Sequence, residues 1–348
     1  MSTPKAANSA LRSSLGGLTG VTVAILTPTA RGSRTGNRHT AMRYARFLRA
    51  AGANVRVMMQ WDDRAYDLLI ALHARRSHDE LARFSNAHPA AGRIVVLTGT
   101  DLYRDLPKDP HARASLAMAD RIIALQARAP SALPARYRTK VDVVFQSVAT
   151  ELVAAPVMRV FRIIVIGHLR DEKDPFRALQ ALRLIPDSRT SGSPLKSIEL
   201  LHVGGALDPT MRSTAEHAMN DEPRYRWIDT RPHAATLRLL ASSHLMVISS
   251  RMEGGANVIC EAARIGVPIL ASRVAGNVGM LGDDYPGYFK LGDERMLAEL
   301  MIKSQRDKNF MRSLRQAVRA RRALFAPVTE ASGVVAAAAR ALQAAESR

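Results

Sequence analysis

The sequence predicts an α/β protein built from two doubly wound, Rossmann-like halves. Short apolar runs rich in β-branched residues alternate with segments of helical periodicity, which is the pattern of parallel strands with helices on both faces of a sheet. This series starts again after Ala154, Ala155 and Pro156, which have the composition of a linker. The chain has 348 residues, enough for two domains with separate cores.

Each half is expected to supply its own sheet. In the first half we expect strands at residues 21–27, 55–59, 68–72, 94–97, 122–125 and 141–145, and helices at 39–51 and 77–86. In the second half we expect strands at 161–166, 198–203, 225–228, 243–249 and 266–271, and helices at 175–184, 210–219, 234–241 and 257–265. Three more helices are expected at 294–306, 309–325 and 328–345. The expected domains are a disordered lead over 1–20, a first domain over 21–155, a second over 156–327 and a last helix over 328–348.

The most informative stretch is Ser249 to Ala271, which predicts a strand, a loop, a helix and a second strand. Glu253 lies in the loop and is followed by Gly254 and Gly255. Glycines there let a ligand approach the main chain closely, although they could equally form a tight turn alone.

The helix of this stretch offers two further groups. Asn257 is placed to be the N-cap, and the N–H groups at a helix N-terminus are a natural seat for a phosphate. Glu261 is the one carboxylate on an otherwise apolar helix face. A carboxylate in that position needs a partner, which could be a pair of sugar hydroxyls or a basic neighbour.

The formal net charge of +19 is concentrated in two segments. Residues 1–61 contain no acidic residue, and in residues 303–322 the basic side chains are opposed only by Asp307. Such an excess favours anionic partners, although a solvated basic surface is the alternative. Because zinc-finger spacing and clustered aromatic residues are both missing, we expect no nucleic-acid partner.

Cysteine usage and hydropathy favour a cytoplasmic protein. Cys260 is the single cysteine, which fits a reducing compartment. No apolar run reaches the length of a bilayer span, so we expect neither a secretory signal nor stable membrane insertion. The sequence has no DxD motif, and we expect no metal and no other cofactor.

Ligands of open α/β sheets bind beyond the carboxyl ends of the strands, so the segments there supply the remaining site residues. After the first strand of the first half, three guanidiniums and short polar side chains could bind an oxyanion, unless they form a solvated loop. These residues are Arg31, Arg34, Thr35, Gly36, Asn37 and Arg38. His73 ends the third strand and could orient a hydroxyl, move a proton or be structural. Asp101 follows the fourth strand as a general base, a hydroxyl ligand or a turn residue.

The segment EGGANVICEA resembles the E-x7-E motif of nucleotide-sugar glycosyltransferases of the GT-B fold, in particular family 4. The resemblance implies two Rossmann-like domains facing across a cleft and a last helix that crosses back to the first domain. It also implies that Glu261 holds the ribose hydroxyls of a UDP- or GDP-sugar. The sugar and diphosphate would face Glu253 and the main chain of Gly254, Gly255, Ala256 and Asn257.

Residues 167–173, GHLRDEK, resemble the G-R-L-x-x-E-K segment of the same family, whose Arg and Lys neutralise the leaving diphosphate. Lys173 matches that Lys, but His168 stands at the Arg position and Arg170 follows two residues later. Either side chain could therefore take the role. Gly204, after the next strand, would leave room for the nucleotide. The residues around Asn277 differ from the usual Pro-Glu pair, which points away from ordinary carbohydrate- or lipid-glycosylating members.

A narrower resemblance covers nearly the whole chain from about residue 21 onward. The segments TPTARGSRTGNRHTAMRYARFLRAAG, LIALHARRS, VVLTGTDLYRDL and RMEGGANVICEA, with GNVGMLGDDYPGYF, resemble the selenosugar synthases of selenoneine biosynthesis. This implies transfer of a sugar, first of all N-acetylglucosamine, from a UDP-sugar to selenophosphate, with formation of a carbon–selenium bond. His73, Asp101 and Glu253 would be the catalytic groups, and the arginine-rich segment would bind selenophosphate.

Two other functions stay open at this point. The protein could be a conventional family 4 transferase for a lipid or glycan, docked on an anionic membrane by residues 303–322. It could also be a nucleic-acid-binding protein that kept the fold of a transferase.

Overall fold

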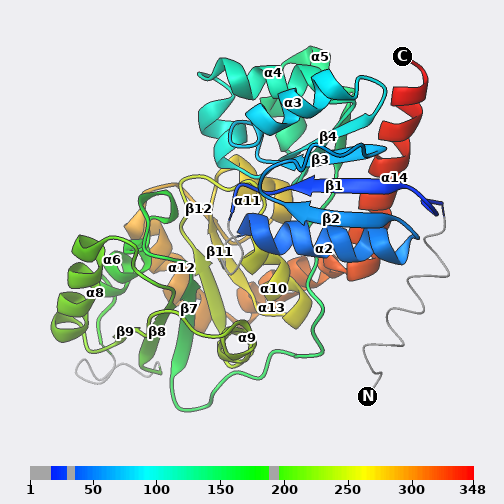
Figure 1. The fold of residues 1–348 in the computed structure, drawn as a ribbon. Coiled ribbons are helices and arrows are strands. Elements are labelled where there is room, and N and C mark those ends of the chain that lie inside the picture. Colours follow the sequence, from blue (N-terminus) through cyan, green and yellow to red (C-terminus); the bar gives the residue numbers. More distant parts are fainter. Residues whose placement is uncertain (1–16, 30–35, 188–195) are drawn as a thin grey trace. The chain divides into compact units, whose positions relative to one another are not determined.

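The structure, a computed structural model, describes residues 17–29, 36–187 and 196–348. It divides into two compact units, each with its own six-stranded parallel sheet. Unit 1 comprises the described residues up to Ser147 together with Ala326–Arg348, and unit 2 is Val148–Phe325. The α/β fold class with two doubly wound parallel sheets is thereby confirmed (Figure 1).

In unit 1 the strand order is β2-β1-β3-β4-β5-β6. The strands are β1 Thr22–Leu26, β2 Asn54–Met58, β3 Leu68–Leu72, β4 Gly92–Leu97, β5 Arg121–Ala124 and β6 Val141–Val143. The helices are α2 Gly36–Ala50, α3 His78–Ala87, η1 Asp101–Asp105, α4 Pro110–Met118, η2 Ala129–Ala132, α5 Ala135–Arg138 and α14 Pro327–Glu346. β2 lies on one side of β1 and β3 lies on the other, so β1 is the topological switch point of this sheet.

In unit 2 the strand order is β12-β11-β10-β7-β8-β9. The strands are β7 Phe161–Ile166, β8 Ile198–Val203, β9 Tyr225–Trp227, β10 Leu245–Ile248, β11 Ile269–Ser272 and β12 Tyr288–Phe289. The helices are η3 Asp171–Lys173, α6 Arg177–Arg183, α8 Pro209–Asp221, α9 His233–Ala241, α10 Asn257–Ile265, α11 Ala275–Leu281, α12 Glu294–Arg306, α13 Lys308–Ala320 and η4 Arg322–Phe325. In this sheet the topological switch point lies between β7 and β10.

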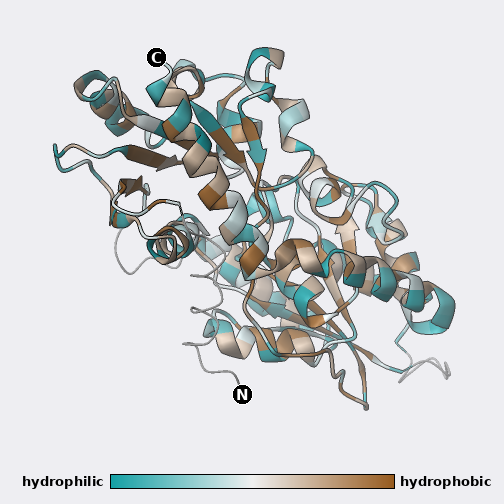
Figure 2. Ribbon diagram, turned by 90° about the vertical axis from the view of Figure 1, so that its right-hand side faces the viewer, coloured by the Kyte–Doolittle hydropathy of each residue, from teal (hydrophilic) through white to brown (hydrophobic). Residues whose placement is uncertain are grey.

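The strands form because both faces of each sheet are covered. All five residues of β3 are buried, which explains why this strand is a continuous apolar run and does not alternate. In unit 1 one face packs against α2 and α14, which contribute Phe47 and Val334 to the core, while Phe84 of α3 packs on the other face. Figure 2 shows the same partition, with hydrophobic strands and helices that are hydrophobic along one side.

The structure corrects two expected helices and adds others. The helix expected at 309–325 ends at Ala320, and a separate 3-10 turn follows it. Asn257 is the first residue of α10, because Ala256 is the N-cap. Sequence periodicity also missed α4, whose start is marked by Asp109 as N-cap, with Pro110 after it. No helix among the described residues combines the length and hydropathy that a bilayer span requires.

The last helix, α14, is held in unit 1 by a buried carboxylate. Glu330 is fully buried and accepts hydrogen bonds from the guanidinium of Arg43, with its Nε 3.0 Å from Oε2 and its NH2 3.0 Å from Oε1. The main-chain N–H of Ser147 donates to the same carboxylate at 2.8 Å. These contacts tie α14 to α2 and to the last residue of unit 1 before the chain enters unit 2.

We expect Glu330→Gln to destabilise the protein, because it removes the negative charge from a largely buried ion pair with Arg43. The loss should be about 3 kcal/mol in the free energy of unfolding, measured by urea titration. Glu346→Gln, at the exposed end of the same helix, is the matched control and should change it by less than about 0.5 kcal/mol. Equal effects of the two substitutions would show that the buried pair does not hold α14.

Candidate functional site

The carboxyl edge of the unit 2 sheet brings together the loops that follow β7 and β10. These strands are neighbours at the switch point, where open α/β sheets bind ligands. Ser249 donates its hydroxyl to the main-chain oxygens of Lys173, at 3.1 Å, and Asp174, at 2.9 Å. The main-chain N–H of Arg251 donates to the oxygen of Glu172 at 2.8 Å. The two loops therefore form one connected structure.

Lys173 and Glu253 meet at the centre of this structure. The Lys173 Nζ lies 2.6 Å from Glu253 Oε1, and the Ser250 hydroxyl donates to the same oxygen at 2.6 Å. Glu253 is 7% exposed, whereas the Lys173 side chain is 37% exposed. Glu253 Oε2 has no hydrogen-bond partner within the part of the chain that the structure describes. The pair thus presents one cation and one carboxylate oxygen at the strand ends.

Two glycines are required by close approaches of the main chain around this pair. A Cβ at Gly204 would lie 1.9 Å from the main-chain oxygen of Gly167, so the loop after β8 could not reach the loop after β7. A Cβ at Gly276, in α11, would lie 1.9 Å from the main-chain oxygen of Glu253. Sequence reasoning singled out Gly204 but missed Gly276.

The glycine loop leads directly into α10. Gly254 and Ala256 are buried and Gly255 is half-buried, and the loop ends where Asn257 opens the helix. Ala256, as N-cap, has no side chain that could bond to the first N–H groups of α10. The N-terminus of this helix lies beyond β10 and carries a partial positive charge, so it suits an anion.

Glu261, one turn along α10, is 7% exposed and pairs with a histidine. His233, the first residue of α9, has its Nε2 2.9 Å from Glu261 Oε1. The hydrogen bond to Glu261 raises the pKa of His233 above its ordinary value, against the opposing effect of burial. The basic neighbour considered from the sequence therefore exists, but its side chain is 65% exposed and can move away. Glu261 Oε2 has no hydrogen-bond partner among the described residues.

His168 and Arg170 differ sharply in their surroundings. The N–H of Gly205 donates to His168 Nδ1 at 2.9 Å, and burial, followed by the charge of Arg170, lowers the pKa of His168. His168 is therefore neutral near pH 7 and supports the loop after β8. Arg170 is exposed, and its guanidinium has no partner among the residues described.

In unit 1 the topology places the described end of the basic segment, residues 36–38, and His73 after two neighbouring strands. The segment follows β1, His73 follows β3, and β1 pairs with β3 in parallel. Arg31, Arg34 and Thr35 lie outside the described residues. Gly36, Asn37 and Arg38 form the first turn of α2, which contains no acidic residue.

His73 is buried and has a strained main chain. Its φ is +73°, in the left-handed region that a histidine rarely adopts. The N–H of Arg76 donates to Nδ1 at 3.3 Å, so Nε2 carries the proton and faces the Thr100 hydroxyl at 3.1 Å and Asp105 at 3.8 Å. Burial lowers the pKa of His73 despite the opposing charge of Asp101. The neutral ring can thus donate a hydrogen bond, as either a functional or a structural histidine.

Asp101 has the contacts of a turn residue. Its Oδ1 accepts the main-chain N–H groups of Thr98 at 2.8 Å, Gly99 at 2.8 Å and Leu102 at 3.0 Å, while its Oδ2 accepts that of Ala74 at 3.0 Å. The side chain is fully buried. Of the three roles open to Asp101, these contacts favour the turn, because four N–H donors occupy the lone pairs that a base would need.

One group of possible metal ligands occurs among the described residues, at the adjoining N-terminal turns of α3 and α4. Ligand atoms of His78, Asp79 and His111 lie within 4.8 Å of one another. The two imidazole rings stack with centroids 4.5 Å apart. Burial, followed by the charge of His111, lowers the pKa of His78. The group belongs to neither of the strand-end sites.

Three residues that the sequence analysis did not select make side-chain contacts with the expected site residues. They are Ser250, His233 and Asp105. Ser250 and His233 follow β10 and β9 at the carboxyl edge of the sheet, so their positions were a usable signal. Asp105 comes near His73 in a π-helix formed by residues 101–105, and no sequence pattern predicts a π-helix there.

Comparisons with known proteins agree with this architecture. Residues 156–321 match the family described as glycosyl transferases group 1. No protein of curated function matches the sequence. HepE of Anabaena, in complex with UDP and glucose, has a TM-score of 0.71 at 15% identity, over 94% of this chain and 100% of HepE. Sucrose-phosphate synthase from Thermosynechococcus elongatus has a TM-score of 0.67 at 16% identity, over 88% of this chain and 95% of the synthase.

At these identities the solved structures establish the fold. The two parallel sheets and these neighbours together give the chain an α/β fold of the two-domain GT-B type. The family match covers most of unit 2, including Lys173, Glu253 and Glu261. Residues 156–321 thus resemble the glycosyl transferases group 1, within a chain of GT-B fold.

Proposed function

We propose that this protein is a glycosyltransferase that moves a sugar, N-acetylglucosamine in first place, from a UDP-sugar to selenophosphate. The product is a selenosugar with a new carbon–selenium bond. The observation that carries the transferase activity is the joint placement of Lys173, Glu253 and Glu261 at the carboxyl edge of a group 1 domain. The solved neighbour HepE, which was determined with UDP and with UDP-glucose, supports a UDP-sugar as the donor.

Each part of the donor has a matching group in unit 2. Glu261 Oε2 is available to accept from the ribose hydroxyls, and His233 can swing away to release Oε1. The start of α10, where the N-cap Ala256 makes no side-chain hydrogen bond, and the Lys173 ammonium suit the diphosphate. Arg170 is a better second cation than His168, because the neutral His168 already accepts a main-chain hydrogen bond.

The acceptor is assigned to unit 1. Arg38 lies in the first turn of α2 and has no ion-pair partner among the described residues. A helix N-terminus without acidic residues, which follows β1 as His73 follows the neighbouring strand β3, suits a small and multiply charged anion. The resemblance to selenosugar synthases in this segment favours selenophosphate over an alcohol of a lipid or glycan.

The proposed reaction needs only the UDP-sugar, selenophosphate and water. A selenium lone pair of selenophosphate attacks the anomeric carbon, and the bond from that carbon to the UDP oxygen breaks with its electrons going to UDP. Lys173 and Arg170 stabilise the charge that develops on the leaving diphosphate. Hydrolysis of the phosphorus–selenium bond then gives phosphate and the selenosugar. His73 would donate its Nε2 proton as a hydrogen bond to the acceptor oxygens.

The direct test is a donor panel. The purified protein is incubated with selenophosphate and UDP-N-acetylglucosamine, UDP-glucose or GDP-sugars, and the products are read by mass spectrometry. We expect UDP and a selenosugar, with UDP-N-acetylglucosamine turned over fastest. Turnover of a UDP-sugar with lipid or glycan acceptors alone would replace this proposal by the conventional family 4 activity, and no turnover of any UDP-sugar would refute both.

We expect Glu261→Gln to weaken UDP binding by about tenfold to a hundredfold, because a hydrogen bond to a charged acceptor contributes about 1.5–3 kcal/mol. The affinity for UDP is measured by calorimetry. Glu216→Gln, on the exposed face of α8, removes the same charge from unit 2 and should leave the affinity unchanged. Unchanged UDP affinity in Glu261→Gln would contradict the placement of the ribose.

The His233–Glu261 pair also predicts a pH dependence. The pKa of His233 is raised in the free protein, and a ligand that takes over Glu261 removes the cause of that rise. Binding should therefore release a proton, so UDP affinity should increase as pH rises from about 6.5 through the raised pKa of His233. His233→Gln should flatten this dependence. A dependence of the same slope in the variant would assign the titration to another group.

A further inference from the structure

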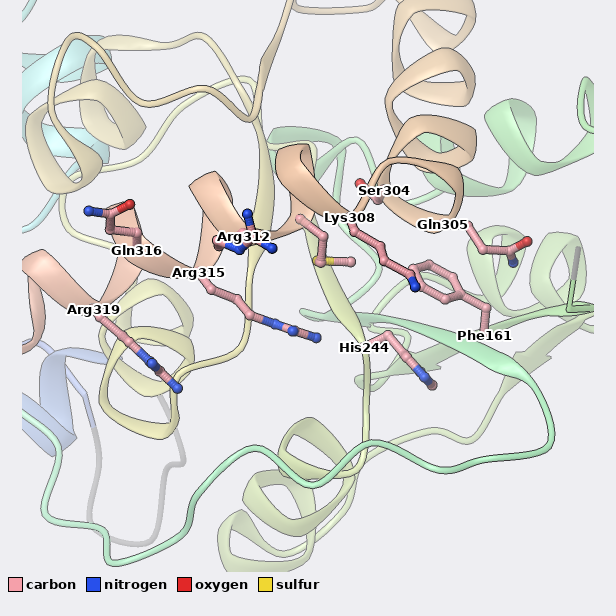
Figure 3. Close-up of a pocket in the computed structure, with 10 residues that line it drawn as sticks. Phe161, His244, Ser304, Gln305, Lys308, Arg312, Arg315, Gln316 and Arg319 are labelled. Atoms are coloured by element: carbon pink, nitrogen blue, oxygen red, sulfur yellow. The ribbon is translucent and has the colours of Figure 1, made fainter.

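A groove of about 770 Å³ lies in unit 2, at the edge of the sheet opposite to the donor residues. Its floor includes Phe161, the first residue of β7, and His244, which immediately precedes β10. Their rings are 4.7 Å apart. The helix α13 forms one wall, and Figure 3 shows Lys308, Arg315 and Arg319 extending from it over the groove.

The wall formed by α13 carries only positive charge. Lys308, Arg312, Arg315 and Arg319 line the groove, and no lining residue is acidic. None of the four has an ion-pair partner within the described ranges, although Arg312 donates to the side chain of Asn309 at 2.8 Å. Positions 308 and 319 are about 16 Å apart along a helix. The four cations thus form a line rather than a cluster.

His244 reports a positive potential in the groove. The main-chain N–H of Arg162 donates to His244 Nδ1 at 3.1 Å. Burial, followed by the charges of Lys196, Arg315 and Arg162, lowers the pKa of His244 to about 4. No carboxylate contributes to this shift, so the groove favours an anion and disfavours a second cation.

The shape and chemistry of the groove restrict the class of anion. The apolar face of α13, with Phe310, Met311, Leu314 and Val318, is buried within unit 2, and no large apolar side chain of this helix is exposed. A helix that inserts into a membrane surface would need such a face. Phe161 is 5% exposed, so it offers little area for stacking a nucleobase.

We propose that this groove binds a small linear polyanion that carries two or more phosphate groups, along the line formed by Lys308, Arg312, Arg315 and Arg319. Two guanidiniums, those of Arg315 and Arg319, make bidentate contacts with neighbouring phosphates. The site is separate from the donor site, because the groove lies at the amino ends of β7 and β10 and the donor residues follow their carboxyl ends. It does not depend on the identity of the transferase acceptor.

The experiment follows the His244 ring by NMR in the full-length protein, with the signal assigned by its loss in His244→Gln. Inorganic tripolyphosphate is the probe. A bound polyanion should raise the pKa of His244 by about one or more, because the imidazolium gains a nearby negative charge. An unmoved His244 signal at concentrations where tripolyphosphate binds would overturn the proposal.

Matched variants separate the groove from general attraction to a basic protein. Arg315→Gln with Arg319→Gln should weaken tripolyphosphate binding by about tenfold or more, measured by calorimetry with UDP present. Arg238→Gln with Arg295→Gln removes the same charge from exposed positions of α9 and α12 and should retain the affinity. Equal losses of tripolyphosphate affinity in the two double variants would show that the ligand is attracted by the net charge of the protein and does not bind in the groove.

Two further probes identify the source of the phosphate. Orthophosphate should bind more weakly than tripolyphosphate by about tenfold or more, because it spans fewer cations. Any sedimentation of the protein with phosphatidylglycerol vesicles should be the same with and without the substitutions Arg315→Gln and Arg319→Gln. Vesicle binding that needs both arginines, without tripolyphosphate binding, would assign the groove to a membrane surface and reject the small ligand.

Discussion

The contact between Lys173 and Glu253 organises the donor edge of unit 2. The two residues are 80 positions apart in sequence, and they meet because β7 and β10 are parallel neighbours whose loops leave the sheet on the same side. The pair gives the buried Glu253 carboxylate a cationic partner, which a buried carboxylate requires. It also fixes the positions from which Ser250 and the glycine loop extend toward α10. The donor roles proposed for Lys173 and Glu253 depend on this junction.

The large positive charge of the chain is not uniformly available to ligands. Many arginines are used internally: Arg43 pairs with Glu330, Arg121 with Asp142, and Arg224 with Glu222. These pairs join α2 to α14, β5 to β6 and two residues of the segment before β9, so their arginines cannot bind an external anion without cost to the fold. The arginines of α13 differ, because they extend from an exposed helix face and have no carboxylate within reach among the described residues. Composition alone could not separate these two groups.

Most of the fold could be predicted from the sequence because its strands are buried on both faces. A fully buried strand such as β3 is a continuous apolar run with sharp ends, and its bounds were predicted without error. The short strand β12 and the helix α11 were missed because each has few residues from which to read a period. The N-cap of α10 was placed at Asn257 because asparagine is a common N-cap, but the N-cap is Ala256, which makes no side-chain hydrogen bond.

The site residues could also be predicted only in part. Lys173, Glu253 and Glu261 could be found because their spacing and strand-end positions are visible in one dimension. The contacts that decide between roles could not be found, because they join distant segments. Asp101 accepts a hydrogen bond from the distant Ala74 in addition to those of its own turn, and Glu261 pairs with His233 from a different helix. The choice between His168 and Arg170 depends on burial, which lowers the pKa of His168, and on the N–H of Gly205, which occupies its Nδ1.

The two edges of the unit 2 sheet are joined by β7 itself. This strand begins at Phe161, on the floor of the basic groove, and ends at Ile166, just before the loop that carries Lys173. A strand of this length spans about 17–20 Å, so an anion in the groove is too far from the donor site to contact a bound nucleotide. It is also too far for a strong direct charge effect through solvent at physiological salt. Any influence of one site on the other must therefore pass through the packing of β7 against β10, where a shift of either strand would move the loops that Lys173 and Glu253 hold together.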